Sequence, residues 1–85
     1  MTRRDALKLR RIQKKINRLA EDSYVSFNAS ESANALLHSD NVEMDSVTEL
    51  YLRALRANLD LRVAMLDEQI DKLFIEQTEI EMGTK

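Results

Sequence analysis

The sequence predicts an all-α protein, a helical hairpin or bundle built around one long C-terminal helix. Three observations support this fold class. The chain of 85 residues has no Pro and a single Gly at position 83, so nothing before that Gly forces a helix to break. Leu or Ile recurs every seven residues from position 52 to position 80. Near the N-terminus, apolar residues follow the three-and-four spacing of an amphipathic helix.

The first predicted helix covers residues 3–21 and is strongly basic, with Thr2 as its expected N-cap. Its apolar residues share one side of the helix: Leu9, Ile12, Ile16 and Leu19. Residues 1–19 contain eight basic residues and one acidic residue, and the basic residues occupy the opposite arc. We expect this arc to meet a protein partner or nucleic acid, through Arg4, Lys8, Arg10, Arg11, Lys14, Lys15 and Arg18.

The segment after the basic helix is rich in Ser, Asn and Asp and has no long apolar period. Its run from Asn28 to Glu31 has the form of an N-cap with an acid three residues later. This run predicts a short middle helix over residues 29–38, followed by a turn. Tyr24 and Phe27, just before it, alternate with smaller residues. We expect these aromatics to plug the bundle rather than to form a very short strand.

The long helix is predicted over residues 46–82. Ser46 followed by Glu49 has the form of a capping box, and Gly83 supplies a C-terminal stop. One apolar face runs along the whole helix. A second apolar face ends near residue 65, and we expect the first and middle helices to cover it: Val47, Leu50, Tyr51, Ala54, Leu61 and Met65. Residues 66–82 are then a one-sided acidic helical extension of a single domain, residues 1–85.

The long apolar face is expected to pair with a second copy of the chain, because so small a chain without disulfides buries too little surface alone. Its expected interface residues are Leu52, Leu55, Leu59, Val63, Leu66, Ile70, Leu73 and Ile80. Val63 and Ile70 at heptad position a, with Leu at d, favour a parallel pair. The acidic residues after position 66 would repel one another in a parallel pair and favour an antiparallel one.

No catalytic or cofactor pattern is found in the sequence, so neither an enzyme nor a cofactor, metal or small-molecule site is expected. The chain has no Cys, and its one His, His38, lies beside Ser39 and Asp40 in a polar turn that would not orient a triad. The single Gly at position 83 excludes a Gly-rich phosphate loop. The chain also has no apolar run long enough to span a membrane and no secretory signal, so a cytoplasmic protein is expected.

These features predict a small protein-binding module that acts as a homodimer through coiled-coil contacts. Adaptors, chaperone-like proteins and inhibitory modules have this character. The alternative is a dimeric nucleic-acid-binding regulator that uses the basic helix. In basic-zipper proteins the basic region runs directly into the zipper, whereas here residues 22–45 separate the two. A weaker alternative is a structural assembly component of a phage or secretion apparatus.

Overall fold

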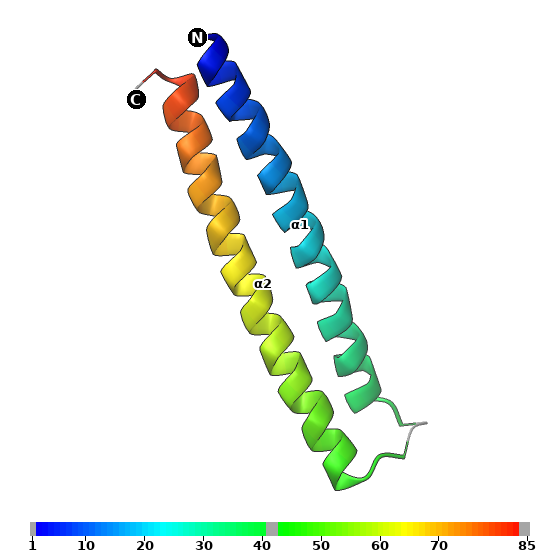
Figure 1. The fold of residues 1–85 in the computed structure, drawn as a ribbon. Helices are drawn as coiled ribbons and strands as arrows, with labels where there is room; N and C mark the ends of the chain where they lie inside the picture. Colours follow the sequence, from blue (N-terminus) through cyan, green and yellow to red (C-terminus); the bar gives the residue numbers. More distant parts are fainter. Residues whose placement is uncertain (1, 41–42, 84–85) are drawn as a thin grey trace.

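Two antiparallel helices form a hairpin in the computed structural model, which describes residues 2–40 and 43–83 (Figure 1). Helix α1 spans Arg3–Leu37 and helix α2 spans Ser46–Glu81. The start of α1 and the end of α2 lie at the same end of the hairpin, and the connection lies at the other. The described residues contain no strand, which confirms the predicted all-α class.

The prediction of a separate middle helix is wrong, because α1 continues without a break from Arg3 to Leu37. Asn28 is not an N-cap but an ordinary residue inside α1, and so is Glu31. Capping chemistry is only a local preference, and burial against a neighbouring helix outweighs it. Here Ser26 and Ser30 are buried against α2, so the polar composition of this segment does not interrupt the helix.

The start of α1 is confirmed by its cap. The Asp5 backbone N–H donates to the Thr2 hydroxyl at 3.1 Å, and the Thr2 backbone N–H donates to the Asp5 carboxylate at 3.5 Å. This reciprocal pair is a capping box. The carboxylate of Asp5 also offsets the unfavourable effect of Arg3 and Arg4 on the helix dipole.

The limits of α2 agree with the predicted helix, but its N-cap is Asp45 rather than Ser46. The Thr48 backbone N–H donates to the Asp45 carboxylate at 2.7 Å. A carboxylate accepts a stronger hydrogen bond than a hydroxyl and interacts favourably with the helix dipole, which explains the shift by one residue. At the other end, Gly83 adopts a φ of 68°, which confirms the predicted stop.

A single seam joins the two helices along their whole length. On α1 most of the buried or half-buried residues follow one uninterrupted three-and-four spacing: Leu9, Ile12, Ile16, Leu19, Ser23, Ser26, Ser30, Ala33 and Leu37. On α2 most of them occupy the predicted heptad positions: Leu52, Arg56, Leu59, Val63, Leu66, Ile70, Leu73, Gln77 and Ile80. Three hydrogen bonds between the helices fix the register, Gln77 to Gln13 at 3.3 Å, Ser23 to Asp67 at 2.8 Å and Ser30 to Asp60.

The two halves of the seam differ in chemistry. Towards the chain termini, Ile12, Ile16 and Ile80 form a buried apolar cluster, with Leu9, Ile70 and Leu73 packed against it. Towards the connection, α1 contributes mainly Ser and Ala. No large side chain in the described residues is fully enclosed. The apolar core therefore lies mostly in the half of the hairpin nearest the termini.

The hairpin is a rod of 60 × 15 × 15 Å with a Cα radius of gyration of 18.8 Å. A globular chain of this length would have a radius of gyration of about 12 Å. Each helix in a two-helix rod can bury only one face, so its other faces remain exposed. Neither helix, as far as the structure describes it, is long and apolar enough to span a membrane.

Candidate functional site

The one histidine takes part in a local contact at the end of α1. The Nδ1 atom of His38 donates to the backbone carbonyl of Asn34 at 3.0 Å, which satisfies one of the terminal carbonyls of the helix. Within residues 2–40 and 43–83, no three His, Asp or Glu side chains gather closely enough to hold a metal ion. The features that stand out on the described surface are instead exposed apolar and basic side chains.

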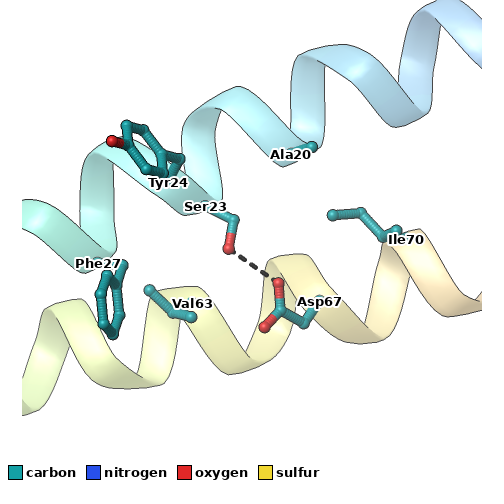
Figure 2. Close-up of a pocket in the computed structure, with 7 residues that line it drawn as sticks. All are labelled: Ala20, Ser23, Tyr24, Phe27, Val63, Asp67 and Ile70. Carbon is teal, nitrogen blue, oxygen red and sulfur yellow. Dashed lines mark hydrogen bonds between the residues drawn. The ribbon is translucent and has the colours of Figure 1, made fainter.

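An open groove of about 340 Å³ lies between the two helices near the middle of the rod (Figure 2). Its lining residues come from both helices: Ala20, Ser23, Tyr24 and Phe27 from α1, and Val63, Asp67 and Ile70 from α2. At its base, the Ser23 hydroxyl donates to the Asp67 carboxylate. In Figure 2, Phe27 lies next to Val63, whereas the ring of Tyr24 points away from α2. A concave, mainly apolar lining of this kind suits an apolar side chain of another protein.

Tyr24 and Phe27 were expected to plug the bundle, and this prediction is wrong. Their exposed fractions are 67% and 50%. The reason is the register of α1, which places Ser23 and Ser26 in the seam and leaves the neighbouring aromatics at its edge. The groove exists because these seam residues are small while the flanking residues are large.

The face of α2 that was expected to pair with a second copy packs on α1 of the same chain. Leu66 and Ile80 are buried there, and the other six expected interface residues are half-buried: Leu52, Leu55, Leu59, Val63, Ile70 and Leu73. Pairing of two chains through this face would require the hairpin to open. Dimerisation itself stays a prediction.

The second apolar face of α2 was expected to be covered by the first and middle helices, and it is exposed instead. Val47, Leu50, Tyr51, Leu61 and Met65 all lie on the exposed surface. The helical wheel correctly separates the two faces of α2. The structure places α1 on the longer, more continuous face rather than on the second face.

The basic residues of α1 are exposed, without exception: Arg3, Arg4, Lys8, Arg10, Arg11, Lys14, Lys15 and Arg18. Because the helices are antiparallel, the half of α1 that carries these residues runs alongside the acidic end of α2. Even so, among the described residues no ion pair within 4.0 Å joins a basic side chain of α1 to an acid. The three ion pairs found are i to i+4 pairs within α2, Arg53 with Glu49, Arg56 with Asp60 and Lys72 with Glu68. The positive arc therefore faces solvent.

The groove was missed by sequence reasoning, although a signal for it was present. Ser23, Ser26 and Ser30 continue the spacing set by Leu9, Ile12, Ile16 and Leu19. When small polar residues continue an apolar period, they indicate a helix that packs closely on a neighbour. That signal would have given one long helix and would have placed Tyr24 and Phe27 beside the seam.

Comparisons with protein-family models, with curated proteins and with solved structures give no significant match. The groove, the exposed face of α2 and the basic arc of α1 are therefore interpreted from their own geometry.

Proposed function

We propose that this protein is a helical protein-binding module whose groove receives an apolar side chain of a partner protein. One observation carries the proposal. The described residues expose thirteen large hydrophobic side chains and bury only five hydrophobic ones. Exposed apolar patches of this extent on a small chain mark interaction surfaces, because burying them against a partner releases free energy.

The groove is the best-defined of these surfaces. Aromatic side chains at the edge of a concave site supply much of the binding energy in protein interfaces. Tyr24 and Phe27 are the aromatic residues of the lining, and the small side chains of Ala20 and Ser23 lie beside them. The Asp67 carboxylate, which accepts from Ser23, also gives the site an acceptor for a polar group next to the bound side chain. A partner helix with one protruding apolar residue fits these features.

This role belongs to adaptors, chaperone-like proteins and inhibitory modules, which act by binding rather than by catalysis. The proposal includes a homodimer and a cytoplasmic setting, as the sequence indicates. A structural component of a larger assembly remains a weaker alternative, and growth beyond a dimer with rising concentration would favour it.

A binding assay with matched variants tests the groove. The double variant Tyr24→Ser/Phe27→Ser removes both rim aromatics, and Val25→Ser removes an equally exposed apolar residue of α1 that does not line the groove. We expect proteins captured by the immobilised wild-type chain to be retained by the Val25 variant and lost from the double variant. Circular dichroism checks that both variants remain helical. Equal capture by all three chains would refute the proposed role of the groove.

The second candidate function is nucleic-acid binding through α1. The observation that favours it is the arc of exposed cations, which form no ion pair within 4.0 Å with any acid of the described residues. Arg4, Lys8, Arg11, Lys15 and Arg18 form a stripe that spans on the order of 21 Å along the helix. Such a stripe can contact several phosphates, and binding would then weaken steeply as salt is raised.

Electrophoretic mobility shifts at several salt concentrations test this candidate. Replacing Arg4, Lys8, Arg11 and Lys15 by Gln should lower the salt dependence of binding if these residues contact phosphates. Replacing the four basic residues of α2, Arg53, Arg56, Arg62 and Lys72, by Gln removes the same charge and serves as the control. If the wild-type chain binds neither DNA nor RNA at low salt, this candidate is removed.

A further inference from the structure

The outer face of α2, turned away from α1, carries an apolar stripe that ends at Met65. Its six residues are separated by four, three, four, three and four positions: Val47, Tyr51, Ala54, Asn58, Leu61 and Met65. Its four large members are all exposed. The order of these separations reads the same from either end. A stripe with this property matches a second copy of itself when the two helices run antiparallel.

We propose that a second copy of this chain covers the stripe, with the two α2 helices packed antiparallel. In the matching register, Val47 lies level with Met65 of the second copy, Tyr51 with Leu61, and Ala54 with Asn58. This register pairs all six positions. A shift by one heptad in one direction would set Tyr51 against Glu68 of the second copy and Val47 against Lys72. A shift in the other direction would carry Leu61 and Met65 past the start of the second copy's α2.

A shallow depression on the same face supports this register. It measures about 210 Å³ and is lined by Asn58, Leu61, Arg62 and Met65, with Leu66 and Gln69 on the side nearer α1. The first four of these residues occupy positions i, i+3, i+4 and i+7, which is the arrangement that forms a hole in knobs-into-holes packing. In the antiparallel register, Tyr51 of the second copy lies opposite the centre of that hole. The twofold symmetry repeats the contact, so each chain supplies one exposed Tyr51 and one hole.

The residues at the centre of the stripe also suit close packing. Ala54 is small, so the two helices can approach each other near the symmetry axis. Asn58 is the one polar member, and in this register it lies level with the small Ala54 of the second copy, close to the symmetry axis. The large side chains lie towards both ends of the stripe, where the helices of such a pair diverge.

Charge selects the antiparallel direction over the parallel one. Asp67, Glu68 and Asp71 follow directly after the stripe. In a parallel pair, Glu68, which lies next to the stripe, would be beside its own counterpart. An antiparallel pair carries the two acidic segments to opposite ends of the dimer, where they are far apart.

The stripe and the groove are separate surfaces. Val63 and Asp67 line the groove, whereas Leu61 and Met65 point to other sides of α2, since successive helical residues turn by about 100°. Both grooves therefore remain open in the proposed dimer. This inference rests on the dimeric state included in the proposed function, but it does not depend on the groove.

Sedimentation velocity over the micromolar concentration range tests whether the chain dimerises through the stripe on α2. We expect the wild-type chain of 9.9 kDa to approach twice its mass as concentration rises. Leu61→Glu should remain monomeric. Ile75→Glu is the matched control, because Leu61 and Ile75 are both 60% exposed on α2 but Ile75 lies beyond the stripe. Circular dichroism should show equal helix content in the three proteins.

Each result of these experiments would contradict a different part of the proposal. A wild-type chain that stays monomeric would overturn both the dimer and the proposed face. A dimer that survives Leu61→Glu would overturn the face alone. The Tyr24→Ser/Phe27→Ser variant should still dimerise, so a loss of partner capture in that dimer tests the groove independently.

Disulfide trapping tests the direction, since the chain has no Cys of its own. We expect Val47→Cys and Met65→Cys proteins, carrying tags of different size, to form a mixed disulfide when combined under oxidising conditions. Each variant alone should remain uncrosslinked, because its Cys residues lie at opposite ends of the stripe. Crosslinking within either variant alone would indicate a parallel pair, and no crosslinking in the mixture would also contradict the proposal.

Discussion

In the half of the hairpin nearest the connection, short polar side chains of α1 make the contact with α2. Ser23 and Ser30 of α1 are buried in the seam, and each donates its hydroxyl to a carboxylate of α2, Asp67 and Asp60 respectively. Because a buried hydroxyl is costly unless it is hydrogen-bonded, these bonds make the small polar residues acceptable there. The same bonds hold the register in a region with little apolar burial.

Ser30→Ala should lower the free energy of unfolding by about 1 kcal/mol, because it removes the hydroxyl that donates to Asp60. The loss is limited, since the Asp60 side chain is 56% exposed and can be solvated by water. Asp60→Asn keeps an acceptor oxygen and should cost less. Urea denaturation of both variants measures the difference. An Asn variant less stable than the Ala variant would show that charge rather than this hydrogen bond matters.

The stability of the start of α2 depends on pH through the carboxyl group of Asp45. The hydrogen bond from the Thr48 backbone N–H lowers the pKa of the Asp45 carboxyl below its usual 3.8. A folded-state pKa below the unfolded value means that the ionised cap stabilises the protein above pH 3.8. That contribution is lost as the pH falls through the lower, folded-state pKa.

With Asp45→Asn, the melting temperature should therefore fall less steeply as the pH is lowered from neutral to acidic values. Asn caps a helix about as well as Asp and does not titrate, so the melting temperature near neutral pH should change little. Thermal melts between neutral pH and pH 2 measure the effect. Asp45→Ala should lower the melting temperature at neutral pH, which confirms that the cap acts. If the melting temperature of the Asn variant falls at low pH as steeply as that of the wild-type chain, other carboxyl groups cause the pH dependence.

At the scale of the helices, α2 has two apolar faces, of which one packs on α1 and the other is exposed. Its heptad face, from Leu52 to Ile80, packs on α1 along the full length of the hairpin. One side of the segment 66–82 is therefore covered by α1. This segment contributes Leu66, Ile70, Leu73 and Ile80 to the seam, and its Gln77 is hydrogen-bonded to Gln13. The segment 66–82 is therefore the part of α2 that packs on the apolar half of α1.

Gln77→Pro tests the role of this segment. An independent extension would lose only its own last turns. In the hairpin, a Pro at position 77 also displaces Ile80 from its cluster with Ile12 and Ile16, so the free energy of unfolding should fall by at least about 3 kcal/mol. Ser46→Pro is the control, because Pro is tolerated at the first position of a helix. Chemical denaturation followed by helix content distinguishes global destabilisation from local fraying.

At the scale of the whole molecule, the long thin shape limits what one chain can bury. A rod 15 Å across consists of two helices side by side, and each has most of its circumference exposed. Adding a second hairpin is the simplest way to cover more of this surface. The proposed antiparallel contact overlaps the two rods only near their connections, since the stripe ends at Met65.

Small-angle X-ray scattering follows this geometry directly. At low concentration, the monomer should give a radius of gyration close to the 18.8 Å of its Cα atoms. The antiparallel dimer, overlapped around position 56 of α2, should reach a maximum dimension of about 80 Å. Two rods packed side by side over their full length would keep the 60 Å length of one hairpin. A dimer no longer than the monomer would contradict the proposed arrangement.

The amino-acid sequence by itself determined the helical class, the limits of α2 and the caps at Thr2 and Gly83. These features depend on local chemistry, since the absence of Pro, the heptad spacing and the capping residues act within a few residues. The exposure of the basic arc followed from the sequence as well, because eight cations on one arc are costly to bury together.

Only the tertiary structure decided which face of α2 packs on α1. A helical wheel separates the faces of a helix but does not say what packs on them. Burial of Ser23, Ser26 and Ser30 against α2 kept α1 continuous, although the local signals near Asn28 favoured a break. The same packing put Tyr24 and Phe27 at the edge of a groove. The groove needs side chains from both helices, so it depends on how the two helices pair, which no local stretch of sequence fixes.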